Sequence, residues 1–226
     1  MRHRALAFGL LAASCLAAQA PAPAQAAAAD ASADVPRVTF TRSFKGSDPA
    51  FLEIQVSQDG HARFQAKDTD TDPLSTLTFT ASPAAVQEIF SRTATLGGFA
   101  SPLQSKQKVA YTGDKMLAFD DATRHNAQEF TYTTIPPAAA LVELFEKISV
   151  SGTDAIRVQR AMRYDRLDLL DLMDHVQSDW SAHLMAEPQL LAPVLEQAAA
   201  NPDLMDAARK RAQKLAQAMT ASPHKP

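Results

Sequence analysis

The sequence predicts an α+β fold, with a mainly antiparallel sheet of six or seven strands packed by two helices and followed by a small C-terminal helical subdomain. Apolar residues alternate with polar ones along much of 36–134, which is the period of a half-buried strand. Asp59-Gly60 separates two such segments and is typical of a hairpin turn. Apolar residues at helical spacing begin after Pro136-Pro137.

Seven strands are expected before the long helix. The Asp59-Gly60 turn joins the second and third of them, and the last three follow Ser101-Pro102. The strands are predicted at Arg37–Phe44, around Leu52, Ile54 and Val56, around Ala62, Phe64 and Ala66, around Leu74, Leu77 and Phe79, and at Lys106–Tyr111, Lys115–Asp120 and Ala127–Thr133.

Two helices are expected to pack on the sheet. Ser82 precedes Pro83 and is a suitable N-cap for a helix over 83–95. The apolar positions of the second helix stay in phase through Gly152, so one helix is predicted from Ala138 to Tyr164, with Gly152 allowing close packing. Arginines at 157–166 are then followed by aspartates at 165–174. In a single helix this order of charges would oppose the helix dipole, so a break is predicted at 164–167.

The similar segments 84–90 and 139–145 suggest that 36–164 is an internal β-β-β-α repeat, although two amphipathic helices of similar composition would also match. Residues 165–221 are predicted to form the helical subdomain. Within it, Glu187-Pro188 and Asn201-Pro202 are each expected to begin a helix, the last running over Pro202–Met219. Residues 222–226 are expected to be a frayed tail.

The first 26 residues have the pattern of a secretory signal peptide. Two arginines precede an apolar segment, and Ala24-Gln25-Ala26 resembles a cleavage site. Residues 27–35 are expected to be a disordered tether, and no later segment is apolar enough to cross a membrane. Export to the periplasm or the medium is therefore predicted. Residues 11–15 also resemble a lipobox, so lipid anchoring through Cys15 is an alternative.

Two pairs of segments resemble a group of exported bacterial proteins of no assigned function. One pair is 38–42 with the Asp59-Gly60 hairpin, and the other is 144–148 with 161–165. The resemblance covers most of the chain after the signal peptide. It implies export and an α+β fold, and it assigns no catalytic residue.

Composition and motifs exclude several classes of function. The chain has a formal net charge of −3 and no run of basic residues, which argues against binding to nucleic acid. It lacks the common nucleophile, phosphate-loop, zinc-protease and dinucleotide motifs, so no cofactor is expected. The stretch 105–108 fits S-x-x-K, but the lysine of a K-T-G motif is absent and the stretch is not expected to be helical.

A catalytic triad of His61 or His125 with Ser43 or Asp59 has no support in the sequence. The main expectation is therefore an exported, non-enzymatic interaction or envelope-associated module, with envelope proteins as partners. A small-ligand carrier is a further alternative, and it would require an apolar pocket between sheet and helices.

The strongest chemical pattern is a ladder at four-residue steps. Asp171, His175 and Asp179 would share one edge of a helix, where carboxylates and an imidazole are suitable ligands for zinc or another divalent ion. His183 continues the spacing, but the helix is expected to end near Trp180. The alternatives are a metal-binding protein or metal-dependent hydrolase on one side, and a solvated acidic helix face on the other.

A second acidic pattern resembles part of a calcium loop. Asp68, Asp70 and Asp72 alternate as the ligands of an EF-hand loop do. Pro73 stands where that loop requires glycine, and Phe79 where it requires a bidentate glutamate. A structural turn between two strands explains the same residues and is the favoured interpretation.

Overall fold

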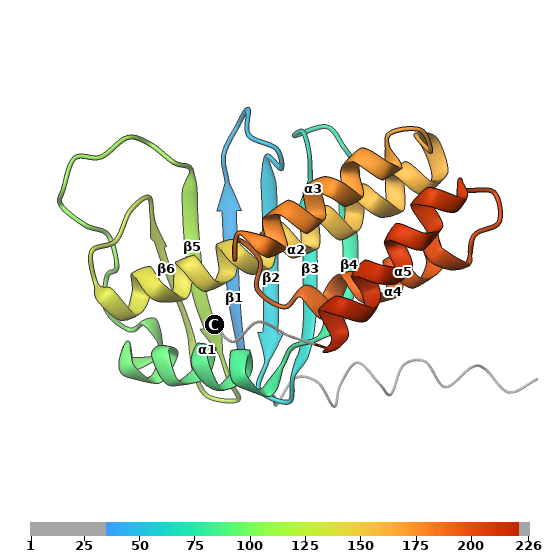
Figure 1. Ribbon diagram of the computed structural model, residues 1–226. Helices are drawn as coiled ribbons and strands as arrows, with labels where there is room; N and C mark the ends of the chain where they lie inside the picture. The colour runs from blue at the N-terminus through green and yellow to red at the C-terminus, as the bar shows by residue number, and fades with distance from the viewer. Residues whose placement is uncertain (1–34, 222–226) are drawn as a thin grey trace, which may run out of the picture. The chain divides into compact units, whose positions relative to one another are not determined.

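The computed structural model describes residues 35–221, so the predicted signal peptide with Cys15, nearly all of the tether and the tail lie outside the described residues. The α+β prediction is confirmed. Six antiparallel strands form one sheet in the order β4-β3-β2-β1-β5-β6 (Figure 1). The strands are β1 (Arg37–Ser43), β2 (Phe51–Ser57), β3 (His61–Lys67), β4 (Ser75–Thr80), β5 (Asp114–Asp120) and β6 (His125–Phe130).

The alternating apolar residues place one side of every central strand in the core. Phe40 of β1 lies opposite Ile54 of β2 and Leu117 of β5, and all three side chains are fully buried. The side chains between them are mostly polar and partly exposed. This is the pattern of an antiparallel sheet that is covered on one face.

Two helices cover the apolar face of the sheet, α1 (Pro83–Thr95) and α2 (Pro136–Tyr164) (Figure 1). A short 3-10 turn, η1 (Gly97–Phe99), follows α1. The ring of Phe145 on α2 stacks on Phe40 with 5.2 Å between ring centroids. Both residues are fully buried, so this aromatic pair fixes α2 across the middle of the sheet.

The predicted continuity of α2 through Gly152 is also observed. A Cβ atom added to Gly152 would lie 2.6 Å from Cγ and Cδ1 of Phe64 in β3. The helix therefore contacts the sheet at this point through its backbone, and only glycine leaves room for the Phe64 ring. The close packing expected at Gly152 is therefore a contact between the α2 backbone and the Phe64 ring of β3.

The C-terminal region contains α3 (Leu169–Ser181), a 3-10 turn η2 (Pro188–Leu191), α4 (Ala192–Ala200) and α5 (Asp206–Ala221). The predicted break lies between Tyr164, where α2 ends, and Leu169, where α3 begins. The end of α2 packs with these helices in a second apolar cluster, which includes Val158, Met162, Leu169, Met173, Val176, Leu191 and Leu195. Within residues 35–221, no helix has both the length and the apolar composition needed to cross a bilayer.

Three sequence predictions about this arrangement are wrong. Residues 106–111 form no strand, because Val109 and Tyr111 are both about half exposed and offer no buried face. Four strands precede α1 and two lie between α1 and α2, so 36–164 is not a β-β-β-α repeat. The last helix begins at Asp206 rather than Pro202, because the Asn201 side chain accepts a hydrogen bond from the Asp203 amide and closes a turn.

The connection between α3 and η2 is tied to both sheet-covering helices. The amide of Ala186 donates to the Lys147 carbonyl on α2 at 3.1 Å, and Ser151 donates to the Ala186 carbonyl at 2.6 Å. Glu187, which has a left-handed backbone conformation, is only 7% exposed. Its carboxylate accepts hydrogen bonds from the amide and hydroxyl of Ser82, the N-cap of α1.

Replacing Ser82 with Ala is expected to lower the free energy of unfolding by about 1–2 kcal/mol. The hydroxyl accepts from the Ala85 amide and donates to Glu187, so its loss removes a helix cap and leaves a buried carboxylate with one donor fewer. Urea unfolding measures the effect. The matched control is Ser91→Ala in the same helix, where the exposed hydroxyl bonds only the Glu88 carbonyl. Equal stabilities of the two variants would contradict the prediction.

Candidate functional site

A buried carboxylate lies on the face of α2 that meets α3. Asp154 belongs to a run of buried residues, 151–156, in the middle of the long helix. Its side chain is 2% exposed, and Oδ1 lies 3.7 Å from Nη1 of Arg157. The second oxygen, Oδ2, is buried and accepts no hydrogen bond from any residue of 35–221. A buried carboxylate oxygen without a donor is costly, which is a reason to look for a ligand at this position.

Two residues of α3 complete a group of three around this carboxylate. His175 and Asp179 lie one helical turn apart, and Nε2 of His175 is 3.5 Å from Oδ2 of Asp179. One ligand atom from each of Asp154, His175 and Asp179 lies within 4.8 Å of the other two. Exposure decreases from 54% for the His175 side chain to 18% for Asp179 and 2% for Asp154. The group therefore extends from solvent into the contact between α2 and α3.

The surroundings of Asp154 favour its protonated form when no cation is bound. Burial raises the pKa of the Asp154 carboxyl to about 6, and the nearby Asp179 carboxylate acts in the same direction. Arg157 and His175 act oppositely and lower it. The net effect is that the protein itself poorly compensates the negative charge of the ionised Asp154 carboxylate beside Asp179.

A cleft of about 390 Å³ lies beside the group and is bordered by Asp154 and Asp179. Its other charged residues form three ion pairs, Arg42 with Glu146, Arg157 with Asp48, and Lys147 with Glu143. Asp154 and Asp179 are two further acids, so the lining holds five acids and three Lys or Arg residues, and Arg157 is shared between Asp48 and Asp154. The electrostatic field of the cleft therefore favours a cation.

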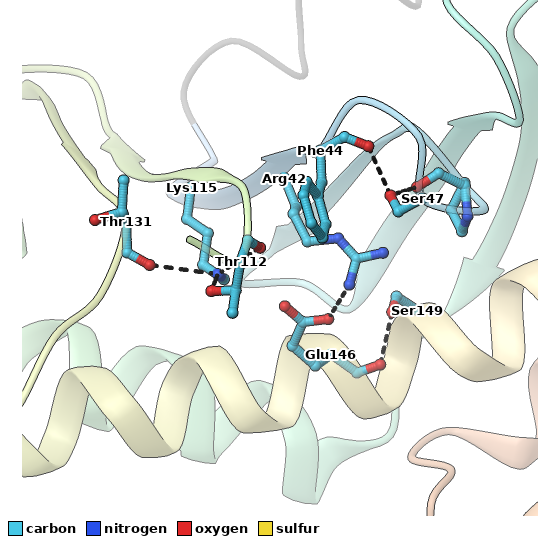
Figure 2. Close-up of polar contacts among 9 residues, drawn as sticks. Arg42, Phe44, Ser47, Thr112, Lys115, Thr131, Glu146 and Ser149 are labelled. Atoms are coloured by element: carbon cyan, nitrogen blue, oxygen red, sulfur yellow. Dashed lines mark hydrogen bonds and ion pairs between the residues drawn. The ribbon is translucent and has the colours of Figure 1, made fainter. Parts of the chain in front are cut away.

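The wall of this cleft near the sheet is held by polar contacts that do not belong to the group. Figure 2 shows Arg42 of β1 pointing to Glu146 of α2, with 2.6 Å between Nη1 and Oε2. Lys115 of β5 is buried nearby and donates to Thr112 and to the Thr131 carbonyl (Figure 2). Burial lowers the pKa of the Lys115 ammonium, but its hydrogen bonds use its donors within the sheet. We therefore assign Lys115 a structural role.

The structure brings together only part of the predicted Asp171, His175 and Asp179 ladder. Asp171 is exposed and lies outside the three-residue group. Each four-residue step turns about 40° beyond a full turn of the helix, so the ladder drifts away from α2. His183 lies beyond the end of α3 and has a positive φ. Asp154 takes the place that sequence reasoning gave to Asp171.

Two of the three acids in the stretch that resembles a calcium loop, Asp68 and Asp72, make protein contacts. The Asp68 carboxylate pairs with Arg160 of α2. The Asp72 carboxylate accepts from the Thr69 amide at 3.0 Å, inside a turn that also contains Asp70. Among residues 35–221, none of the three belongs to a group with metal-ligand spacing. The contacts of Asp68 and Asp72 agree with the favoured interpretation, a structural turn between β3 and β4.

The imagined catalytic triad is not assembled. Nδ1 of His125 lies 2.9 Å from Oδ1 of Asp120, and Nε2 of His61 lies 4.0 Å from Oδ2 of its neighbour Asp59. Strand register places Ser43 opposite Phe51 and Asp114, at the far end of the sheet from both histidines. Ser105 accepts from the amide of Gln107 in a loop, without the helix that an S-x-x-K nucleophile requires.

Comparison with known proteins adds no assignment to this geometry. No model of a known protein family matches the chain, and no curated protein matches it in sequence.

Proposed function

We propose that the protein binds a divalent cation of the first transition row, with zinc the first candidate, through Asp154, His175 and Asp179. One observation carries the proposal. A buried carboxylate with an unpartnered oxygen lies within 4.8 Å of an imidazole nitrogen and a second carboxylate oxygen. A divalent cation would supply the charge that this group lacks and would complete the coordination of the Asp154 oxygen.

The donor set supports the choice of metal. Imidazole nitrogen favours zinc, copper, nickel or iron over calcium and magnesium, which prefer oxygen ligands alone. Two carboxylates and one histidine are ligands found around zinc. Three protein ligands leave a coordination position for water, so the site is also compatible with a hydrolytic metal. None of the motifs of a metal-dependent hydrolase is present in the sequence.

The proposal fits an exported, non-enzymatic module, the role expected from the sequence. A bound cation would join α2, which packs on the sheet, to α3, which packs in the C-terminal cluster. It would then act as a structural link. Association with envelope proteins and membership of an exported family remain predictions, since nothing in residues 35–221 identifies a partner.

Zinc binding is tested by calorimetric titration of the chelator-stripped protein. The wild type is expected to bind one zinc ion, and Asp179→Asn is expected to weaken the affinity by about a hundredfold, because a ligating charge is lost. The matched control is Asp171→Asn, the same substitution two helical turns earlier on α3 and outside the group. The control is expected to bind zinc as the wild type does.

Two results would overturn this assignment. Absence of zinc binding by the wild type would remove the site. Equal weakening by Asp171→Asn and Asp179→Asn would show that zinc collects on a diffuse acidic surface rather than at the three-residue group.

A further inference from the structure

A second and larger cleft, of about 540 Å³, lies between α1, α2 and the connection from α3 to η2. Small side chains from the two helices face it, including Ala84 and Ala85 of α1 and Ala140 of α2. Met185 lines it from the connection, and Pro188 lines it from the start of η2. The small alanine side chains leave space between the two helices unfilled, and their methyl groups make the walls mostly apolar. The volume of the cleft is in the range of small-molecule sites.

Most of the charges around this cleft are already paired. Arg92 donates to Glu88 one turn earlier on α1, with 2.5 Å from Nη2 to Oε1. Lys147 pairs with Glu143 one turn earlier on α2 at 3.0 Å. His183 also borders the cleft. The lining contains three acids, and Glu88 and Glu143 are the two that pair with Arg92 and Lys147. The third, Glu187, has hydrogen bonds from Ser82 and Gln189 and no ion pair with a Lys or Arg of the described lining.

Glu187 supplies a specific polar point in the apolar cleft. Its Oε2 accepts from the Ser82 amide and from Nε2 of Gln189, each at 2.6 Å, and its Oε1 accepts from the Ser82 hydroxyl at 2.7 Å. A carboxylate offers about four acceptor positions, so one position on Oε1 remains for a further donor. These three donors, the Ser82 amide, the Ser82 hydroxyl and the Gln189 side-chain amide, are uncharged, so they do not neutralise the charge of the carboxylate.

We propose that this cleft binds a small primary amine with an apolar tail. The tail lies between the alanines of α1 and α2, and the ammonium group donates to Oε1 of Glu187. Charge complementarity selects an ammonium group over a carboxylate at this position. A ligand carboxylate would be repelled by Glu187 and would bring no hydrogen-bond donor to it. The site is separate from the Asp154 group, and it does not depend on the cation proposed there.

The test is calorimetric titration of the whole protein, in chelator, with three probes of equal chain length: octylamine, octanol and octanoate. Octylamine is expected to bind about tenfold more tightly than octanol, and octanoate more weakly than both. In Glu187→Gln, which retains an oxygen acceptor for Ser82, octylamine and octanol are expected to bind with similar affinity. The presence of chelator keeps the result independent of any metal at Asp154.

A matched pair of variants locates the binding. Ala140→Leu fills the cleft and is expected to weaken octylamine binding by about tenfold or more. Ala139→Leu adds the same side chain at the neighbouring exposed position of α2, which does not line the cleft, and is expected to leave binding unchanged. Failure of octylamine to bind, tighter binding of octanoate, or equal binding by the two alanine variants would each overturn the proposal.

Discussion

Replacing Asp154 with Asn is expected to stabilise the metal-free protein at pH 8 and to abolish its stabilisation by zinc. The pKa of Asp154 rises from an ordinary value of 3.8 to about 6 in the folded protein. Between these values the folded state holds a proton that the unfolded state has released, so wild-type stability falls as the pH rises through this window. The loss approaches its full size about one pH unit above the folded-state pKa and is on the order of 3 kcal/mol.

The asparagine side chain of the variant cannot ionise, so the variant avoids this loss. The expected result is a variant more stable than the wild type at pH 8 and similar to it near pH 4. Urea unfolding in chelator at the two pH values measures the difference. Zinc at a thousandfold excess over Kd should add about 4 kcal/mol to the wild type at pH 8 and little to the variant. The wild-type gain should shrink below pH 6, because protons compete with the metal for the Asp154 carboxylate.

The control for this experiment is Asp171→Asn, which removes an exposed carboxylate from α3 and should change neither the pH dependence nor the zinc effect. A variant Asp154→Asn that is less stable than the wild type at both pH values would refute the interpretation. That result would mean that the contact with Arg157, at 3.7 Å, outweighs the cost of burying the charge.

Gly152→Ala is expected to destabilise the protein by about 3 kcal/mol, although alanine is the better helix former by about 1 kcal/mol. The new Cβ would lie 2.6 Å from Cγ and Cδ1 of Phe64. Phe64 is fully buried in β3, so its ring has no free space to enter. Either α2 or β3 has to move, and the whole sheet-to-helix contact is disturbed. Thermal and urea unfolding both report the change.

The double variant Phe64→Leu with Gly152→Ala separates this clash from other causes. Leucine removes the ring that the Cβ meets, so the two substitutions are expected to cost less together than the sum of their separate effects. Additive effects would show that the loss does not arise from contact with the Phe64 ring. Stabilisation by Gly152→Ala alone would show that the helix and the strand adjust without cost.

Much of the fold was predictable because its elements bury one side only. Alternation around Phe40, Ile54 and Phe64 indicated the central strands, and helical spacing after Pro137 indicated α2. The predictions were wrong where the local signal was weak. Residues 106–111 were expected to form a strand but have no buried face, and Pro202 was placed in a helix that begins after a side-chain turn.

The candidate site was predictable only on one helix. Four-residue spacing correctly placed His175 and Asp179 together, because neighbours on a single helix are fixed by its geometry. Asp154 comes from α2, and its approach to α3 depends on tertiary packing that the spacing does not encode. The only available signal was an acidic residue among the small residues 151–155 of a continuous helix.

The central place of β1 in the sheet has a consequence for how the chain is made. β1 precedes every other strand, yet it pairs with β2 on one side and with β5 on the other. Until residues 114–120 leave the ribosome, a nascent chain that contains β1 to β4 has an open edge along 37–43 and an apolar face that still lacks α2. Such an edge readily pairs with strands of other chains. We therefore expect a chain that ends before residue 114 to aggregate more readily than the chain with the finished sheet.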